Sequence, residues 1–269
     1  MRSRNYFLSE NNFSLTNPDK WYKRVNEIVQ RIFMLRSVLL VAAALCITAL
    51  AAASIVVVNI FSTAEKHGRR IGRRWAKILL SLSGVKIEIV GTENIIAGKP
   101  HILMANHQSD FDILICMAGI PVDFIWTAKK ELFRIPVFGK AMRASGFIEI
   151  DRQDREKAIQ SLAQAAAKLQ TGISVATFPE GTRSRDGQLL PFKQGMFYLA
   201  IQTGIPIVPV TIIGSGKIMS KKSLHVNRGG IIMAIDKPID VSGYTIETRS
   251  ALMEKVRDIM AANQEKYEV

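Results

Sequence analysis

One run of 21 residues, from Val38 to Val58, contains no charged side chain. As a helix rising about 1.5 Å per residue, it would cover roughly 30 Å, the thickness of the apolar core of a bilayer. The run begins too late and is too long for a secretory signal peptide, and basic sequence follows it. It therefore predicts a helix that crosses a membrane or dips into one leaflet.

Basic residues surround this apolar run. The formal net charge is +13, and residues 1–80 hold 13 Lys or Arg against 4 Asp or Glu. A basic surface can bind nucleic acid or an anionic membrane. Its place beside the apolar run favours membrane lipid, and we expect no nucleic-acid partner. Because basic residues lie on both sides of the run, the positive-inside rule leaves its orientation open.

Amphipathic helices are predicted on both sides of the run. Before it, apolar residues recur at helical spacing among basic ones, at Trp21, Val25, Ile28, Ile32 and Leu35. After it, Trp75, Ile78, Leu79 and Leu82 recur in a helical pattern that ends near Gly84. We therefore predict that residues 1–84 form membrane-anchoring helices. An alternative is that the first helix packs on the domain and exposes its basic face to solvent.

From residue 85 to 269, short β-rich runs alternate with helical segments, which predicts an α/β domain with a central mixed sheet flanked by helices. The candidate strands are Val85–Val90, Ile102–Ala105, Phe124–Thr127, Gly146–Ile150, Ile173–Phe178, Ile207–Ile212 and Ile231–Ile235. The candidate helices are Ile113–Ala118, Asp154–Gln170, Gln194–Thr203 and Ile246–Tyr267. No CxxC or HExxH spacing indicates a metal site. The stretch from Gly214 to Lys217 matches a phosphate-binding loop only faintly, so nucleotide binding has little support.

A possible catalytic pair follows the second candidate strand, in Met104-Ala-Asn-His-Gln-Ser-Asp-Phe-Asp112. In a strand-to-helix turn, the spacing from His107 to Asp112 can place the carboxylate beside the imidazole. The carboxylate then fixes the tautomer, and the other ring nitrogen can take a proton from a hydroxyl. Asp110 is a rival partner, and Ser109 is a conceivable nucleophile. Alone, the spacing is more often structural than catalytic.

A second polar stretch, Phe178-Pro-Glu-Gly-Thr-Arg-Ser-Arg-Asp-Gly187, follows the fifth candidate strand. Its glycines allow a turn, and Thr182 and Arg183 can donate to a phosphate, Arg183 in bidentate fashion. Three further basic residues, Lys129, Arg152 and Lys193, are candidates for the same anionic site, because ligands gather beyond the carboxyl ends of strands. Each stretch alone could be a solvated surface turn.

Taken together and in order, these stretches resemble the 1-acyl-glycerol-3-phosphate acyltransferases of the PlsC type. The matching blocks are Asn106-His107-x4-Asp112, Lys129-Lys-Glu-Leu-x3-Pro136-x2-Gly139, Gly146-x-Ile-x-Ile-Asp-Arg152, Phe178-Pro-Glu-Gly-Thr-Arg-Ser184, Phe192-Lys-x-Gly195 and Ile205-Pro-Ile-Val-Pro209. The resemblance covers roughly residues 85–215. It is specific for the superfamily and less specific for the acceptor.

The resemblance implies a role for each candidate residue. His107 would be the general base and Asp112 its partner, while Lys129, Arg152 and Arg183 would hold the acceptor's phosphate. The remaining substrate-binding candidates are Glu180, Gly181, Thr182 and Lys193. The acyl donor would be acyl-CoA or acyl carrier protein, with no metal or other cofactor, and the acceptor lysophosphatidic acid. We expect a membrane location, in a bacterial inner membrane with the catalytic domain on the cytoplasmic side.

Other functions remain possible on the sequence alone. The acceptor could be glycerol-3-phosphate or another lysolipid, such as a lyso-aminolipid. A hydrolase using Ser109 would be a different class of enzyme, but no nucleophile-elbow glycine pattern surrounds that serine. A non-enzymatic membrane adaptor would explain the charge and the apolar run, but not the ordered blocks.

Overall fold

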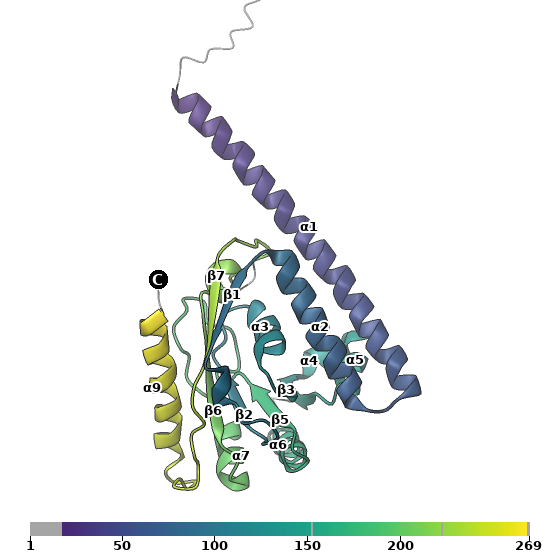
Figure 1. Ribbon diagram of the computed structural model, residues 1–269, viewed down its shortest axis with the longest axis vertical. Coiled ribbons are helices and arrows are strands. Elements are labelled where there is room, and N and C mark those ends of the chain that lie inside the picture. Colours follow the sequence, from purple (N-terminus) through teal and green to yellow (C-terminus); the bar gives the residue numbers. More distant parts are fainter. Residues whose placement is uncertain (1–17, 152, 222, 268–269) are drawn as a thin grey trace, which may run out of the picture.

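The computed structural model describes residues 18–151, 153–221 and 223–267, and the central element is a seven-stranded mixed sheet (Figure 1). The strand order is β1-β7-β6-β2-β5-β3-β4. The strands are β1 (Lys86–Val90), β2 (Ile102–Ala105), β3 (Phe124–Lys129), β4 (Ile148–Ile150), β5 (Ser174–Thr177), β6 (Ile207–Ile213) and β7 (Gly230–Ile235). Only the β6–β7 pairing is antiparallel. The predicted α/β class and mixed sheet are therefore confirmed, with strand ends within two residues of those expected.

Helices flank the sheet on both faces. The longer ones are α1 (Pro18–Phe61), α2 (Glu65–Ser83), α3 (Phe111–Gly119), α6 (Arg155–Gln170), α7 (Gly195–Thr203) and α9 (Arg249–Tyr267). Short helices α4 (Lys130–Phe133), α5 (Phe138–Ala144) and α8 (Ser215–Ile218), with the single 3-10 turn η1 (Thr92–Asn94), were not predicted. Segments of this length span too few turns to show helical periodicity.

Alternation along the strands divides the core into two layers. In β2, Leu103 and Ala105 pack with α2 and α3, whereas Ile102 and Met104 pack with α6, α7 and α9. Successive side chains of a strand point to opposite faces, so a fully apolar strand indicates a sheet covered on both sides. The strand that leads to His107 thus lies within a core covered on both faces, and Figure 1 shows helices on both sides of the sheet.

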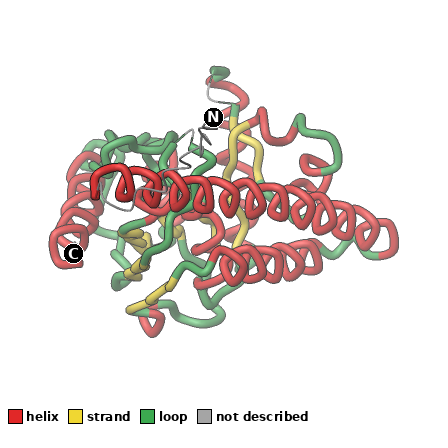
Figure 2. The backbone as a smooth tube through the Cα atoms, turned by 90° about the horizontal axis from the view of Figure 1, so that it is seen from above, coloured by secondary structure: helices red, strands yellow, loops and turns green. Residues whose placement is uncertain are grey.

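Helix α1 is a single continuous helix of 44 residues, in which the first predicted amphipathic segment and the apolar run are joined. Its N-terminal part extends beyond the domain, and its C-terminal part runs beside α2 (Figures 1 and 2). Ala52 and Ile55 pack against Ala141 of α5. Among the described residues, this is the one helix long and apolar enough to cross a membrane, and most of its apolar window is exposed.

Part of the basic charge of α2 faces the domain instead of solvent or lipid. The Arg69 side chain is only 8% exposed and its Nη2 lies 2.8 Å from Asp123 Oδ2. Arg73 donates to the backbone oxygens of Ile120 and Val122, at 2.6 and 2.7 Å. These bonds fasten α2 to the loop between α3 and β3. The division into an anchoring part and an α/β domain between residues 84 and 85 stays a prediction. Helix α2, on the N-terminal side of that boundary, contributes Ala76 and Leu80 to the core of the α/β domain.

Candidate active site

The turn after β2 is fixed to the neighbouring strand by one buried side chain. Asn106 donates from Nδ2 to the backbone oxygen of Ile212 at 2.9 Å and accepts from the Ile212 N–H at 2.6 Å. This two-pronged bond continues the β2–β6 pairing by one residue beyond the strand. His107, the next residue, therefore leaves the sheet edge in a defined direction.

His107 and Asp112 form the predicted pair. The distance from His107 Nδ1 to Asp112 Oδ2 is 2.8 Å, and the His107 and Asp112 side chains are 13% and 0% exposed. The same carboxylate oxygen accepts the backbone N–H groups of Gln108 and Ser109, at 2.6 and 2.8 Å. The first turn of α3 thus holds the carboxylate under the imidazole, and Nε2 is the ring nitrogen available for a substrate proton.

An aromatic stack holds the other side of the imidazole. The ring of His107 lies 3.9 Å from that of Phe178, at an interplanar angle of 9°. Phe178 stacks in turn on Trp126 of β3, with 4.8 Å between ring centroids. The stack was not predicted, because Phe178 reaches His107 only through the pairing of β5 with β2, which no spacing in the sequence indicates. It restricts rotation of the imidazole.

Glu180 braces the turn from the end of β5. Its Oε1 accepts the backbone N–H of His107 at 2.8 Å, and its Oε2 accepts the N–H of Leu190 at 3.0 Å. Burial raises the pKa of this carboxyl to about 7, while the two backbone bonds oppose the shift. The next residue, Gly181, has a positive φ of 73° and donates its N–H to Phe178 at 3.0 Å. That amide is therefore engaged within the turn.

The raised pKa of Glu180 predicts a pH-dependent stability. A carboxyl with a pKa of about 7 in the folded protein, and about 4.3 when unfolded, binds more protons in the folded state between those values. Its contribution to the free energy of unfolding is therefore complete below about pH 4 and falls as the pH rises to about 7. Glu180→Gln should flatten this part of the curve. Thermal unfolding of both proteins between pH 4 and 8 measures the difference, and parallel curves would contradict it.

Asp110, the rival partner of His107, instead forms an ion pair with Arg183 Nη1. Lys221, which the sequence did not single out, donates to the hydroxyl of Thr182 at 3.1 Å and to the backbone oxygen of Arg183 at 2.9 Å. Asp112 is thus the carboxylate at the imidazole. Thr182 and Arg183 lie on an adjacent, more exposed turn.

Of the other basic candidates, Lys129 and Lys193 are described, and both make their contacts elsewhere. Lys129, at the end of β3, is 56% exposed and its Nζ lies 3.5 Å from Glu131 Oε2. Lys193 is exposed, and its backbone N–H donates to Pro179 at 2.7 Å. Arg152 lies outside the described residues. Its neighbour Asp151 binds Lys130 Nζ at 2.8 Å, a pair that sequence reasoning missed.

Ser109 occupies a structural position. Its hydroxyl is buried, donates to the backbone oxygen of Met219 at 2.7 Å and accepts the N–H of Phe111 at 3.3 Å. A hydroxyl that donates its proton to a backbone oxygen on another segment is poorly placed to attack a substrate. The geometry disfavours a hydrolase based on this serine.

Ser109→Ala should therefore retain most of the transferase activity and lose stability. Removing the hydroxyl takes this donor from the partly buried Met219 carbonyl, and one such hydrogen bond contributes about 0.5–1.5 kcal/mol. Initial rates and the midpoint of thermal unfolding check the two effects. An acyl group trapped covalently on Ser109 of the wild-type protein would reverse this assignment.

Comparison with known proteins decides the family. A family model described as Acyltransferase matches residues 86–213. The 1-acyl-sn-glycerol-3-phosphate acyltransferase of Limnanthes alba is 33% identical over 197 residues, covering 73% of this chain and 69% of that protein. The chain belongs to the 1-acyl-sn-glycerol-3-phosphate acyltransferase family. The predicted resemblance is thereby confirmed.

Two further acyltransferase relatives show the extent of the likeness. The Saccharomyces cerevisiae 1-acyl-sn-glycerol-3-phosphate acyltransferase is 39% identical over 186 residues, covering 68% of this chain and 61% of that protein. The crystal structure of the 1-acyl-sn-glycerophosphate acyltransferase PlsC from Thermotoga maritima superposes with a TM-score of 0.76 and 26% identity, covering 88% of this chain and 98% of that one.

The first curated relatives are longer than the part this chain matches. The matched region spans 51–61% of the length of the yeast, Brassica napus and Arabidopsis thaliana acyltransferases. Membership of an acyltransferase family and the long, exposed apolar helix α1 together indicate membrane association.

Proposed function

We propose that the protein transfers a fatty acyl group from a thioester donor to the sn-2 hydroxyl of lysophosphatidic acid, giving phosphatidic acid. The observation that carries the proposal is the 2.8 Å bond from His107 Nδ1 to the fully buried Asp112 carboxylate. It leaves Nε2 as a base for a substrate hydroxyl. The names of the family relatives support the lysophosphatidic acid acceptor.

The proposed reaction has two steps: the acceptor oxygen adds to the thioester carbonyl, and the thiolate is then eliminated. Nε2 of His107 takes the proton of the acceptor hydroxyl while that oxygen attacks the thioester carbonyl. Asp112 stabilises the imidazolium that forms. The tetrahedral oxyanion collapses, the carbon–sulfur bond breaks, and the thiolate leaves and accepts the proton from the imidazolium. Since a thioester is an activated donor, positioning and one base suffice, and the proposed step uses no metal or other cofactor.

We assign the acceptor's phosphate to the polar and basic candidates that follow these strands in the sequence. Thr182 and Arg183 follow β5, and Lys193 lies further along the same connection, just before α7. Lys129 ends β3, and Arg152 follows β4 in sequence. Parallel strands β2, β5, β3 and β4 present their carboxyl ends at one edge of the sheet. A phosphate there would compete with Asp110 for Arg183.

Arg183→Lys tests the phosphate assignment. Lysine keeps the charge but cannot hold two phosphate oxygens with one planar fork, and one charge-assisted hydrogen bond contributes about 1.5–3 kcal/mol. We expect the KM for lysophosphatidic acid to rise about tenfold or more, with the donor's KM little changed. Steady-state kinetics with each substrate varied in turn measures both. A change confined to the donor would move Arg183 to the donor's binding site.

A panel of acceptors tests the proposed substrate against its alternatives. Lysophosphatidic acid, glycerol-3-phosphate and a lyso-aminolipid should be compared at a fixed acyl-CoA concentration. We expect lysophosphatidic acid to give the highest kcat/KM, because it carries both the phosphate and an apolar tail. A higher value for either alternative would change the acceptor while retaining the chemistry.

We also propose that α1 anchors the protein in a bacterial inner membrane, with the α/β domain on the cytoplasmic side. Support comes from the length and exposed apolar surface of α1 and from its basic neighbours. Acyl-CoA and acyl carrier protein, the two donors expected, are cytoplasmic. The acceptor, being a lipid, would reach His107 from the same membrane.

A further inference from the structure

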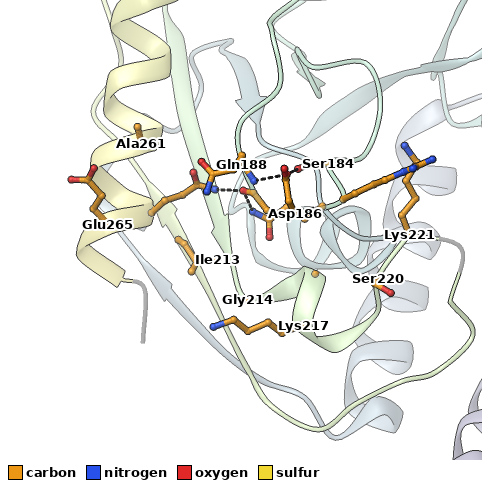
Figure 3. A pocket seen from close by; sticks show the side chains of 15 residues that line it. Ser184, Asp186, Gln188, Ile213, Gly214, Lys217, Ser220, Lys221, Ala261 and Glu265 are labelled. Carbon is orange, nitrogen blue, oxygen red and sulfur yellow. Dashed lines mark hydrogen bonds between the residues drawn. The ribbon is translucent and has the colours of Figure 1, made fainter.

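A polar cleft of about 510 Å³ lies beside the catalytic turn (Figure 3). Its walls come from the loop of residues 184–188, the end of β6 with α8, and the C-terminal part of α9. Gln108, directly after His107, lines it, and Ser184, whose N–H donates to the His107 backbone oxygen at 2.8 Å, lines it too. The cleft therefore adjoins the reacting centre.

The cleft lies on the β6 side of the turn that carries His107. Strand β2, which ends at Ala105, lies between β5 and β6. Ile213 and Gly214 at the end of β6 line the cleft, whereas Lys129 ends β3 on the other side of β2. The cleft adjoins the Thr182–Arg183 turn, because Lys221, which lines the cleft, donates to both of these residues. The cleft and the proposed phosphate site are therefore neighbours.

Amide groups are prominent in the lining. The Nε2 groups of Gln108 and Gln264 both donate to the backbone oxygen of Gly187, each at 3.0 Å. This shared bond orients both side chains and turns their carbonyl oxygens away from Gly187. Gln188 also lines the cleft. Amides of this kind can pair with amide groups of a ligand.

Cations outnumber anions in the same lining. Arg185, Lys217 and Lys221 carry positive charge, against Asp186 and Glu265. The Asp186 carboxylate accepts from the Ser184 hydroxyl at 2.9 Å and from the Gln188 N–H at 3.1 Å, so it is used within its own loop. The faint phosphate-loop likeness at Gly214–Lys217 lies in this wall, although it lacks the first glycine and the final Ser or Thr of a nucleotide loop.

We propose that this cleft binds the phosphopantetheine arm of the acyl donor. The arm has two amide groups and ends in a phosphate ester, which match the glutamines and the cations. The polar lining does not suit an acyl chain, which we place elsewhere. The inference rests on the proposed function and adds to it the direction from which the donor approaches. Acyl-CoA and acyl carrier protein share this arm.

Donor kinetics of the full-length protein in lipid–detergent micelles test the assignment. Lys217→Ala and Gln264→Ala should each raise the KM for oleoyl-CoA, Lys217→Ala by about tenfold, the effect of one charge-assisted bond. The KM for lysophosphatidic acid should stay within about twofold. Lys255→Ala, an exposed lysine of α9 outside the cleft, is the matched control and should change neither value. Ala261→Phe fills the cleft from α9 and should also weaken donor use.

Three donors distinguish the groups that the cleft recognises. Oleoyl-CoA and oleoyl-acyl carrier protein should both lose efficiency in Gln264→Ala, since both contain the arm. An N-acetylcysteamine thioester, which lacks the phosphate and most of the arm, should lose less in Lys217→Ala than oleoyl-CoA does. Loss with oleoyl-CoA alone in every variant would assign the cleft to the nucleotide end of coenzyme A and overturn the proposal.

Binding of free coenzyme A gives a readout that does not depend on turnover. Calorimetric titration of the full-length protein should show about tenfold weaker binding in Lys217→Ala and unchanged binding in Lys255→Ala. A wild-type protein that transfers acyl groups while all three cleft variants keep normal donor KM values would overturn this inference alone. An increase in the KM for lysophosphatidic acid instead would assign the cleft to the acceptor. A wild-type protein with no transfer would overturn the proposed function itself.

Discussion

His107→Ala should lower the rate of acyl transfer by about 10²–10⁴-fold, the usual cost of removing a general base. The imidazole is the group whose position is set by the most independent contacts: Asp112 holds Nδ1, Phe178 stacks on the ring, and Glu180 holds the backbone N–H. Together these contacts orient the ring so that Nε2 can take the proton of the acceptor hydroxyl. Single-turnover rates measured with saturating donor and acceptor report the chemical step directly.

His225→Ala is the matched control for this variant. His225 is exposed in the loop before β7, and its backbone N–H donates to the Ser223 hydroxyl at 3.0 Å. Its removal should leave the rate unchanged. Near-normal turnover in His107→Ala, with the fold retained by circular dichroism, would eliminate the general-base mechanism.

Asp112→Asn should be nearly as severe, lowering the rate by about 10²–10⁴-fold. His107 Nδ1 and the N–H groups of Gln108 and Ser109 all contact the same oxygen, Asp112 Oδ2. An asparagine that keeps its oxygen at this place retains the three contacts but carries no negative charge. The imidazolium that forms when Nε2 takes the proton then loses the charge that stabilises it.

Asp110→Asn is the comparison that separates the two carboxylates. Asp110 pairs with Arg183, whereas the carboxylate bonded to the imidazole is that of Asp112. Its loss should alter the KM for the acceptor more than the rate of the chemical step. If Asp110→Asn proved the more damaging to single-turnover rates, the assignment of His107's partner would be wrong.

Local patterns explain how much of the fold could be predicted. Most strands are short, largely apolar runs, and an unbroken apolar run such as Ile102/Leu103/Met104 indicates a strand covered on both faces. The long apolar run predicted a membrane-type helix. The spacing of apolar residues could not show that α1 is one continuous helix from Pro18 to Phe61. It also could not show that Arg69 and Arg73 point toward the loop before β3.

The contact between His107 and Asp112 was predictable because the two residues are only five positions apart, and one strand-to-helix turn brings them together. The groups that hold the pair come from far along the chain. Asn106 bonds across to Ile212, and Glu180 reaches back to His107, through contacts that only the sheet order creates. The same applies to Phe178. Side chains brought together by topology leave no spacing signal in the sequence.

The basic candidates could be nominated from the sequence, but their contacts could not be predicted from it. The sequence nominates Lys129 and Lys193 as candidates for the anionic site, yet both side chains are exposed. Long cationic side chains are flexible, so a strand-end position does not determine what the ammonium group contacts. Lys221, from a loop without any block, reaches the Thr182–Arg183 turn instead.

The most direct test of the account is the dependence of thiol release on the acceptor. With oleoyl-CoA as donor, the purified protein should release free thiol in equal amount to the phosphatidic acid formed, and only when lysophosphatidic acid is present. This outcome is required if His107 activates the acceptor's own hydroxyl. Thiol released at the same rate without any acceptor would show hydrolysis of the donor and contradict the account.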